Sequence, residues 1–389
     1  MAERRLRATI ALFTLLCLVP SACRKSGSSG VGSAPSASVS GARPAEPHIV
    51  TADELSSPSA FELVVRPDGL RLLWASAKTN AGWLHDAELS QDGTPRGAPR
   101  SVPIPSRSLG KVTDLSAAVV GQQLALVWVE QSKTEARALG TMLVGGAAPL
   151  LVDLGVAALS AESARGNIEV AAEADRDRAL VMWRGLEAPC IEPQATPCVA
   201  FTFRRLRAGA AEATGLPLSV PVPCASHSVE LAVSPGRFHY GVCTREGADP
   251  VTTMFSIQYT PEYARAEPLL KGCLPLGTVE LPGQPWLIAD CHGKRKAEPV
   301  PLTDERVQSE YVDALQISCT PEHVELRQGR FVLSLREPRA DLQAILPPAL
   351  LPTGARAGWT GKSLVVAYLA GSRLETRAFV CRGGTLGPL

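Results

Sequence analysis

The sequence lacks a charge imbalance. The 389-residue chain contains 39 Lys and Arg against 38 Asp and Glu, so its formal net charge is +1. Proteins bind phosphate backbones and anionic lipid surfaces mainly through clustered positive charge. The composition therefore argues against nucleic acid as a partner. It gives no reason to expect electrostatic adsorption to a membrane.

The sequence also lacks the short motifs of common catalytic sites. It contains no Gly-x-Ser-x-Gly elbow, phosphate loop, dinucleotide fingerprint or His-Glu-x-x-His. Ser108-Leu109-Gly110-Lys111 matches Ser-x-x-Lys without its companion motifs, so we attribute that match to chance. The six histidines are scattered: His48, His85, His227, His239, His292 and His323. We expect no catalytic residue and no cofactor, and we interpret His227 and His323, which both precede Val-Glu-Leu, as one repeated structural position.

Zinc-binding cysteine spacing is absent as well, because no Cys-x-x-Cys or Cys/His cluster occurs. No metal site is expected. Cys17 and Cys23 lie in the N-terminal segment, and eight cysteines remain, an even number that suggests disulfides in an exported chain. We predict cross-strand bridges Cys224–Cys243 and Cys273–Cys291, a bridge Cys190–Cys198 across a Pro-rich insertion, and, by elimination, Cys319–Cys381.

The apolar run near the N-terminus, Ala8 to Val19, is shorter than the roughly 20 residues that a membrane span needs. Arginines precede it and Pro20-Ser21-Ala22-Cys23 follows it, as in a signal peptide. The segment resembles a bacterial lipoprotein signal, although Pro20 replaces the usual Leu. The resemblance implies that residues 1–22 are removed and that Cys23 carries a lipid, which anchors the protein in the envelope, periplasmic or at the surface. Ordinary secretion is the alternative.

Residues 23–46 after this signal are rich in Ser, Gly, Ala and Pro and contain almost no large apolar side chain. This composition is typical of a flexible tether. We expect a folded domain to begin at residue 47.

The stretch from Ala60 to Val102 predicts a four-stranded antiparallel meander. Apolar runs alternate with the turns Pro67-Asp68-Gly69 and Asp92-Gly93. Weaker copies follow to the C-terminus. An acidic residue opens the first strand of six units, Trp74, Trp128 and Trp183 occupy like places in the second strand, and a seventh unit has Tyr368 there. The six acids are Glu62, Asp114, Glu169, Glu230, Glu280 and Glu325.

Repeats of this length with several short strands each predict an all-β, seven-bladed β-propeller over residues 47–389, at about 49 residues per blade. Six and eight blades remain alternatives because the fifth and sixth units are the least regular. The segment from Asp304 to Gln316 is the one candidate helix, and it fits a fourth strand with its loop equally well. We interpret the repeated tryptophans as packing between blades rather than as a sugar-stacking platform.

The units resemble the blades of bacterial secreted and surface propeller proteins. The first unit ends in the motif Leu89, Asp92, Gly93, Thr94, Pro95 and Gly97, and part of it returns as Gly384, Thr385, Gly387 and Pro388. Such propellers serve as binding platforms and, less often, as enzymes. We therefore expect a monomeric, envelope-anchored, non-enzymatic binding or scaffold protein with a protein or glycan partner. The alternative is an envelope hydrolase or lyase with acidic residues at the central channel.

The six acids have two interpretations. If their side chains point inward from the first strands, they form a ring in the channel, where like-charge repulsion raises some of their pKa values. The interpretation that we favour is that each acid caps its own strand edge and is solvated or paired with an Arg.

The two ends of the chain predict how the propeller closes. After Gly384-Thr385-Leu386-Gly387, no residues remain for a fourth strand in the seventh unit, whereas residues 47–55 (PHIVTADEL) belong to no unit. We predict that residues 47–55 supply the outer strand of the seventh blade, so that no open edge separates the first blade from the last.

Overall fold

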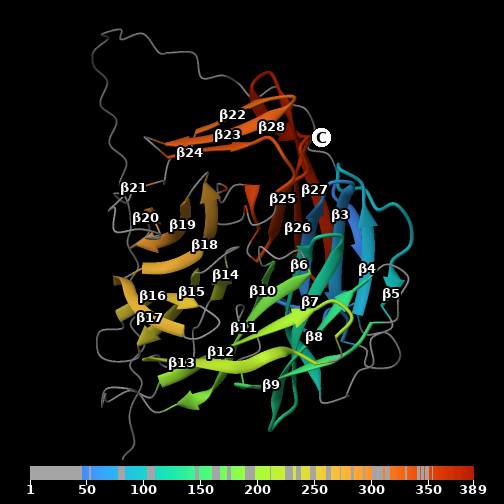
Figure 1. Cartoon of the computed structure of the whole chain (residues 1–389). Helices are drawn as coiled ribbons and strands as arrows, with labels where there is room; N and C mark the ends of the chain where they lie inside the picture. The colour runs from blue at the N-terminus through green and yellow to red at the C-terminus, as the bar shows by residue number, and fades with distance from the viewer. Residues whose placement is uncertain are drawn as a thin grey trace, which may run out of the picture. The chain divides into compact units, whose positions relative to one another are not determined.

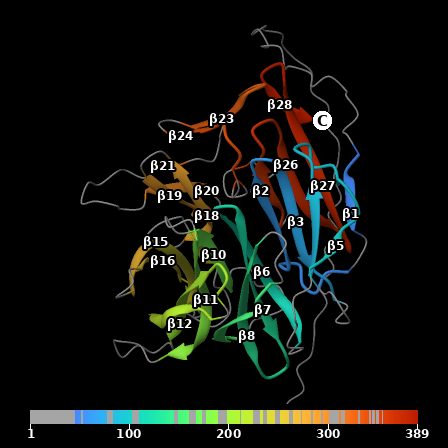
Figure 2. The ribbon, with the colours of Figure 1, turned by 45° about the vertical axis from the view of Figure 1, so that its right-hand side comes forward.

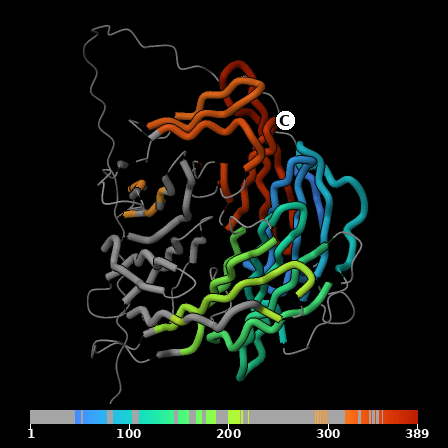
Figure 3. Tube along the Cα trace, in the orientation of Figure 1, coloured from blue at the N-terminus to red at the C-terminus, as the bar shows by residue number. Residues whose placement is uncertain are grey.

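The structure is a computed structural model. The described residues are 46–51, 54–77, 84–102, 110–144, 149–159, 167–172, 177–188, 198–210, 212–223, 231–233, 238–245, 251–259, 264–271, 273–281, 284–291, 294–299, 310–311, 316–328, 331–339, 342, 346, 350–352 and 354–389 (Figure 3). Contacts within the chain group Pro44–Leu389 into one unit. Within the described residues, no helix is long and apolar enough to cross a membrane.

Short strands account for nearly all of the regular structure in this part of the chain. The strands are β1 (His48–Thr51), β2 (Phe61–Arg66), β3 (Gly69–Ala75), β4 (Leu84–Leu89), β5 (Arg100–Ser101), β6 (Lys111–Val120), β7 (Gln123–Gln131), β8 (Ala136–Leu143), β9 (Val152–Ala157), β10 (Ile168–Ala172), β11 (Arg178–Ala188), β12 (Cys198–Arg207), β13 (Thr214–Pro223), β14 (Leu231–Val233), β15 (Phe238–Arg245), β16 (Val251–Tyr259), β17 (Ala264–Lys271), β18 (Cys273–Leu281), β19 (Gln284–Cys291), β20 (Lys294–Pro299), β21 (Glu310–Tyr311), β22 (Gln316–Thr320), β23 (His323–Gln328), β24 (Phe331–Leu335), β25 (Arg356–Trp359), β26 (Leu364–Ala370), β27 (Arg373–Arg382) and β28 (Thr385–Pro388).

These strands form seven antiparallel sheets that follow one another along the chain (Figure 1). The first five sheets are four-stranded meanders in sequence order: β2 to β5, β6 to β9, β10 to β13, β14 to β17 and β18 to β21. The sixth sheet contains β22 to β24, and the seventh contains β25 to β27 with β1 and β28. Of the two interpretations of the segment from Asp304 to Gln316, the fourth strand is confirmed in its described part, because Glu310–Tyr311 forms the fourth strand of the fifth sheet.

The first strands of successive sheets contact one another. Contacts join β2 to β6, β6 to β10, β10 to β14 and β14 to β18, and β25 of the last sheet returns to β2. Each hydrophobic cluster likewise spans neighbouring sheets: one joins the first and second sheets, another the second and third, a third the seventh and first, and a fourth the fifth, sixth and seventh. This closed succession of meanders is a β-propeller, as the repeats predicted.

The local sequence explains the first sheet. In β2, Phe61 and Leu63 are buried while Glu62 between them is half-buried, which is the alternation of an antiparallel strand. Gly69 begins β3 with a positive φ of 147°, which only glycine adopts readily, so the chain can turn sharply after Asp68. Trp74, Trp128 and Trp183 lie on the second strands β3, β7 and β11 and are almost fully buried. They pack between sheets, as expected from their spacing.

The sixth sheet differs from the sequence expectation. The Val-Glu-Leu of residues 324–326 was expected to open a first strand, but it lies in β23, the middle strand of the sheet. The strand before it, β22, contacts β27 and β28 of the seventh sheet. Val324 and Leu326 are buried on either side of Glu325, and this pattern fits a middle strand as well as a first strand. Alternation alone therefore could not identify the strand's position in its sheet.

The seventh sheet shows how the two ends of the chain meet. Strand β1 pairs antiparallel with β27, with His48 opposite Thr376 and Thr51 opposite Leu374 (Figure 2). This is the position in which the sequence placed residues 47–55. The expectation that the C-terminus has no strand to add is wrong, because β28 pairs with the other half of β27, from Phe379 to Arg382. The outer edge of β27 is thus shared by two short strands from opposite ends of the chain.

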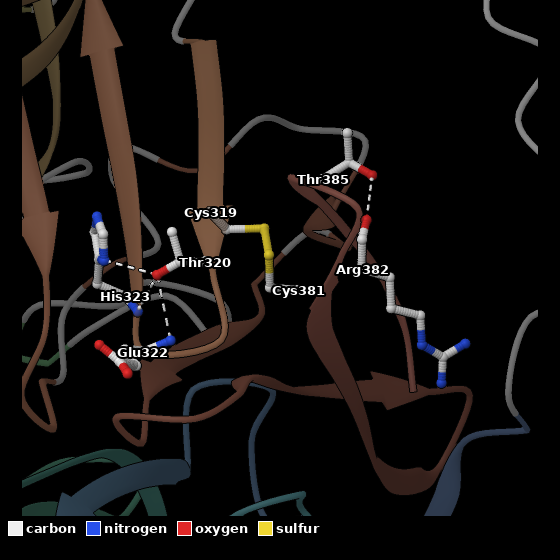
Figure 4. Close-up of a disulfide and its surroundings, with 7 residues drawn as sticks. All are labelled: Cys319, Thr320, Glu322, His323, Cys381, Arg382 and Thr385. Carbon is white, nitrogen blue, oxygen red and sulfur yellow. Dashed lines mark hydrogen bonds between the residues drawn. A yellow bond between two sulfur atoms is a disulfide. The ribbon is translucent and has the colours of Figure 1, made fainter.

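Among the predicted disulfides, the structure contains Cys319–Cys381, which joins β22 to β27 across a sequence separation of 62 (Figure 4). Cys291 is also disulfide-bonded, and the β18–β19 ladder places it directly opposite Cys273. The pairing of these two cysteines stays a prediction, because the side chain of Cys273 is not described. Cys190 and Cys224 lie outside the described residues, so their predicted bridges stay predictions too.

We predict that deleting residues 47–55 lowers the melting temperature far more than deleting the expected tether, residues 24–46. The first deletion removes β1, its pairing with β27 and the buried Val50, which belongs to the cluster between the first and seventh sheets. Thermal unfolding followed by circular dichroism measures both effects.

Two neighbouring residues supply the matched control. Val50→Ala removes buried methyl groups and should cost about 1–2 kcal/mol, whereas Ile49 is 53% exposed and Ile49→Ala should change little. Equal effects from the two deletions would show that residues 47–55 act only as additional linker.

Candidate functional site

The first strands bring five polar side chains together, which we call the first-strand cluster. Its members are Glu62 on β2, Asp114 and Ser116 on β6, Glu169 on β10 and Arg356 on β25. These four strands come from four different sheets and contact one another in turn. Three of the six acids that the repeats singled out therefore lie close enough to affect one another electrostatically.

Glu62 and Arg356 join the seventh sheet to the first. The Arg356 Nε donates to the Glu62 carboxylate at 3.1 Å, and the two side chains are only 14% and 12% exposed. The backbone N–H of Leu63 also donates to Glu62 Oε1 at 3.2 Å. Glu62 thus pairs with an Arg and caps its own strand, as the favoured interpretation expected.

Asp114 joins the second sheet to the third. Its side chain is buried, and its Oδ1 accepts the N–H of Leu115 at 3.0 Å. Its Oδ2 accepts the N–H of Asn167 at 2.8 Å and that of Ile168 at 3.4 Å, where β10 begins. A carboxylate that accepts several backbone N–H groups is held in one orientation, so this side chain serves as a connection between sheets.

Glu169 has the most perturbed environment of the cluster. The Ser116 hydroxyl donates to Glu169 Oε2 at 2.9 Å. The pKa of Glu169 is raised to about 8, mainly by burial and also by the negative charges of Asp114 and Glu62, against the lowering effects of Arg356 and of the Ser116 hydrogen bond. Glu169 is therefore mostly protonated at neutral pH, since its pKa lies above 7.

The chemistry of the cluster has two sides. A neutral carboxylic acid beside ionised carboxylates is an arrangement that enzymes use for acid–base catalysis. Here, however, Glu62 and Asp114 are both engaged in contacts between sheets. Within the described ranges, no group of three or more His, Cys, Asp or Glu side chains could hold a metal ion.

Of the other three acids, Glu325 alone has a described side chain, and it lies outside the cluster. Glu230 lies just before β14, outside the described residues. Glu280 was expected to open a first strand but is the penultimate residue of β18, opposite Pro285 beside the hairpin turn, because that strand already begins at Cys273. Its side chain is not described. Glu325 lies on the middle strand β23 and pairs with Arg327 at 2.9 Å, so it is not on a first strand.

Sequence analysis missed Arg356 and Ser116. The seventh unit has no acidic residue at the start of its first strand, and Arg356 occupies that position instead. A basic residue in place of one acid in a repeated series was the signal that could have predicted the Glu62–Arg356 ion pair.

The tryptophans and histidines take structural positions. Trp286 and Trp359 are buried like the three tryptophans already described, and Trp83 lies outside the described residues. His85 stacks on Trp74 with ring centroids 5.4 Å apart. His323 begins β23, and its Nδ1 is hydrogen-bonded to the Thr320 hydroxyl at 2.8 Å (Figure 4). The shared position of His227 and His323 stays a prediction, because His227 lies outside the described residues.

No known protein family and no curated protein matches this sequence. Among solved structures, the chain is similar to a PQQ-bound aldose sugar dehydrogenase from Streptomyces coelicolor, with 13% identity over 86% of this chain and 98% of the other and a TM-score of 0.38. It is also similar to the SapL1 lectin in complex with α-methyl fucoside, with 12% identity, 86% and 97% coverage and a TM-score of 0.43. A prolyl endopeptidase has 14% identity, 86% and 50% coverage and a TM-score of 0.44. Similarities at this level do not select a function.

The raised pKa of Glu169 predicts how stability depends on pH. Because the folded-state pKa of about 8 exceeds the ordinary pKa of 4.5 of a glutamate side chain, the folded chain holds this proton more tightly than the unfolded chain does. The contribution of this proton to the free energy of unfolding is fully present below pH 4.5 and is lost as the pH rises through 8. Glu169→Gln mimics the neutral acid, so the variant should lack this loss. Urea unfolding between pH 5 and 9 measures the difference.

Glu322→Gln is the matched control, since Glu322 is exposed in the β22–β23 turn and lies outside the cluster. The control should follow the wild-type pH profile. A Glu169→Gln profile parallel to that of the wild type would show that Glu169 ionises normally in the folded chain.

Proposed function

We propose that this protein is an exported, lipid-anchored, non-enzymatic binding protein that holds a protein partner on its β-propeller. The observation that carries the proposal is that the acids of the first-strand cluster are occupied by contacts between sheets. In many enzymes, the carboxylates of the active site are free to meet a substrate. Here Glu62 and Asp114 instead hold neighbouring sheets together.

Exposed aliphatic side chains support a binding role. Val156 at the end of β9, Leu159 after it and Leu186 in β11 are 44%, 47% and 58% exposed. Two hydrogen bonds join their chain segments: the Trp183 indole N–H donates to the Val156 carbonyl, and the Ala158 N–H donates to the Arg184 carbonyl. We call Val156, Leu159 and Leu186 the apolar seam. Clusters of exposed apolar side chains commonly mark protein contacts.

A protein partner is favoured over a glycan. Sugar sites commonly present aromatic rings for stacking, whereas the five described tryptophans are all buried and the seam is aliphatic. The seam also lies at a β-bulge, since the register of β11 against β12 shifts between Arg184 and Glu187. Bulges often redirect side chains at functional positions.

The test is affinity capture from envelope extracts with the full chain as bait. We expect a protein to be retained by the wild type and lost with Leu186→Arg, because a charge in the seam opposes burial of its apolar side chains. Leu389→Arg is the control, since Leu389 is 41% exposed but lies at the C-terminus. Equal retention by both variants would contradict a role for the seam, and retention of polysaccharide alone would favour a glycan partner.

The hydrolase or lyase alternative rests on the raised pKa of Glu169 beside Asp114 and Glu62. Its test uses the same extracts. Breakdown of an extract component by the wild type that stops in Glu169→Gln would establish the alternative and overturn the non-enzymatic proposal.

The lipid anchor has a separate test. In cells fed a labelled fatty acid, the wild type should incorporate label and fractionate with membranes, whereas Cys23→Ala should lose the label and move to the soluble fraction. Cys17→Ala is the control, since Cys17 lies within the apolar run of the signal. Unlabelled wild-type protein would support ordinary secretion instead.

A further inference from the structure

A small polar cavity lies at the hairpin end of the first sheet. Its volume is about 60 Å³. The charged side chains that line it, together with Gly69, are Arg66, Asp68, Arg71, Glu88 and Arg96. Arg66 ends β2, whereas Glu62 lies near the start of that strand. We call this cavity the hairpin pocket. It is distinct from the first-strand cluster.

Gly69 lies beside the pocket at the start of β3. A Cβ at this position would meet the Leu89 carbonyl oxygen at 2.7 Å, so the close approach of the two strands requires glycine, whereas its distance of 3.5 Å to a terminal nitrogen of Arg96 would be an ordinary contact. The guanidinium of Arg96 lies over the turn and donates to the Asp68 carbonyl at 3.1 Å. The position of Arg96 is thus built into the turn that joins β2 to β3.

Most charges around the pocket are already paired. Arg71 donates to both oxygens of the buried Asp86, with the Nε–Oδ1 distance at 3.1 Å. Glu88 pairs with Arg100 at 2.6 Å. Arg66 approaches Asp68 at 3.5 Å, and 74% of that aspartate side chain is exposed, so this pair is weak.

Arg96 is the exception. Among the described residues, no carboxylate lies within ion-pair distance of its guanidinium, and its one hydrogen bond goes to a backbone carbonyl. A guanidinium carries five N–H donors and stays charged at every physiological pH. The three arginines that line the pocket therefore exceed its two carboxylates by one positive charge.

We propose that the hairpin pocket binds an oxyanion group, a carboxylate or a phosphate, through Arg96 with help from Arg66. Arginine is the side chain best suited to such groups, because its planar donors match their oxygen atoms. A volume of about 60 Å³ is well below the roughly 300–1,000 Å³ of pockets that hold a whole organic ligand, so the hairpin pocket suits one small anionic group. This proposal does not depend on the partner proposed for the apolar seam.

The experiment is isothermal titration calorimetry of the full chain with sodium acetate and with inorganic phosphate, at constant ionic strength set with chloride. We expect saturable millimolar binding of at least one anion. Arg96→Gln should weaken that binding by about tenfold or more, as expected for the loss of a charged hydrogen bond. Arg66→Gln should weaken it less, because Arg66 already pairs with Asp68.

Arg382→Gln is the matched control, because Arg382 is exposed on β27 in the seventh sheet and should leave binding unchanged. Tighter binding of acetate would identify a carboxylate ligand, and tighter binding of phosphate a phosphorylated one. Should Arg96→Gln fail to fold, Arg96→Lys is measured instead, with weaker but detectable binding expected. The proposal is overturned if neither anion saturates, or if Arg382→Gln weakens binding as much as Arg96→Gln does.

Discussion

In the described part of the chain, each hydrophobic cluster is shared between neighbouring sheets, and the rest of the structure depends on that constraint. A four-stranded meander has two faces, and the clusters show each face shared with the next sheet along the chain. The first sheet packs on the second through one cluster and on the seventh through another. A sheet is therefore stable only while its neighbours are in place, so the first and last sheets must meet.

This constraint explains why polar side chains lie where neighbouring sheets meet. The first strands have no further strand to pair with, so their side chains make the contacts between neighbouring sheets. Asp114 bonds the backbone of the third sheet, Ser116 bonds Glu169, and Glu62 bonds Arg356. Ser59 adds a similar bond from the first sheet to the Thr113 carbonyl of the second. The charge of Glu169 is suppressed mainly because its side chain is buried, and the nearby carboxylates of Asp114 and Glu62 add to this effect.

The closing sheet joins the two ends of the chain. Strand β27 is ten residues long, and β1 and β28 each cover part of its outer edge. The Thr376 hydroxyl donates to the Gly93 carbonyl and the Thr360 hydroxyl to the Gln91 carbonyl, which ties the seventh sheet to a turn of the first. The disulfide Cys319–Cys381 adds a covalent connection between the sixth and seventh sheets. The contacts of the seventh sheet with the first and sixth sheets are thus made by residues that are far apart in the sequence.

The sequence by itself determined the all-β repeat architecture, the strands of the first sheet, the buried tryptophans and the outer strand near residue 48, but it missed β28 of the seventh sheet. These features follow from alternation and turn residues, which are local in the chain. Only the tertiary structure decided that one Val-Glu-Leu tripeptide ends β18, the first strand of the fifth sheet, and that another lies in β23, the middle strand of the sixth. The alternation of buried and exposed residues is the same in every strand of a meander, so it could not distinguish the two positions. The tertiary structure also decided that Arg356 meets Glu62 across 294 residues and that Arg96 lies over Gly69. Those contacts depend on how whole sheets pack, and no local pattern records that packing.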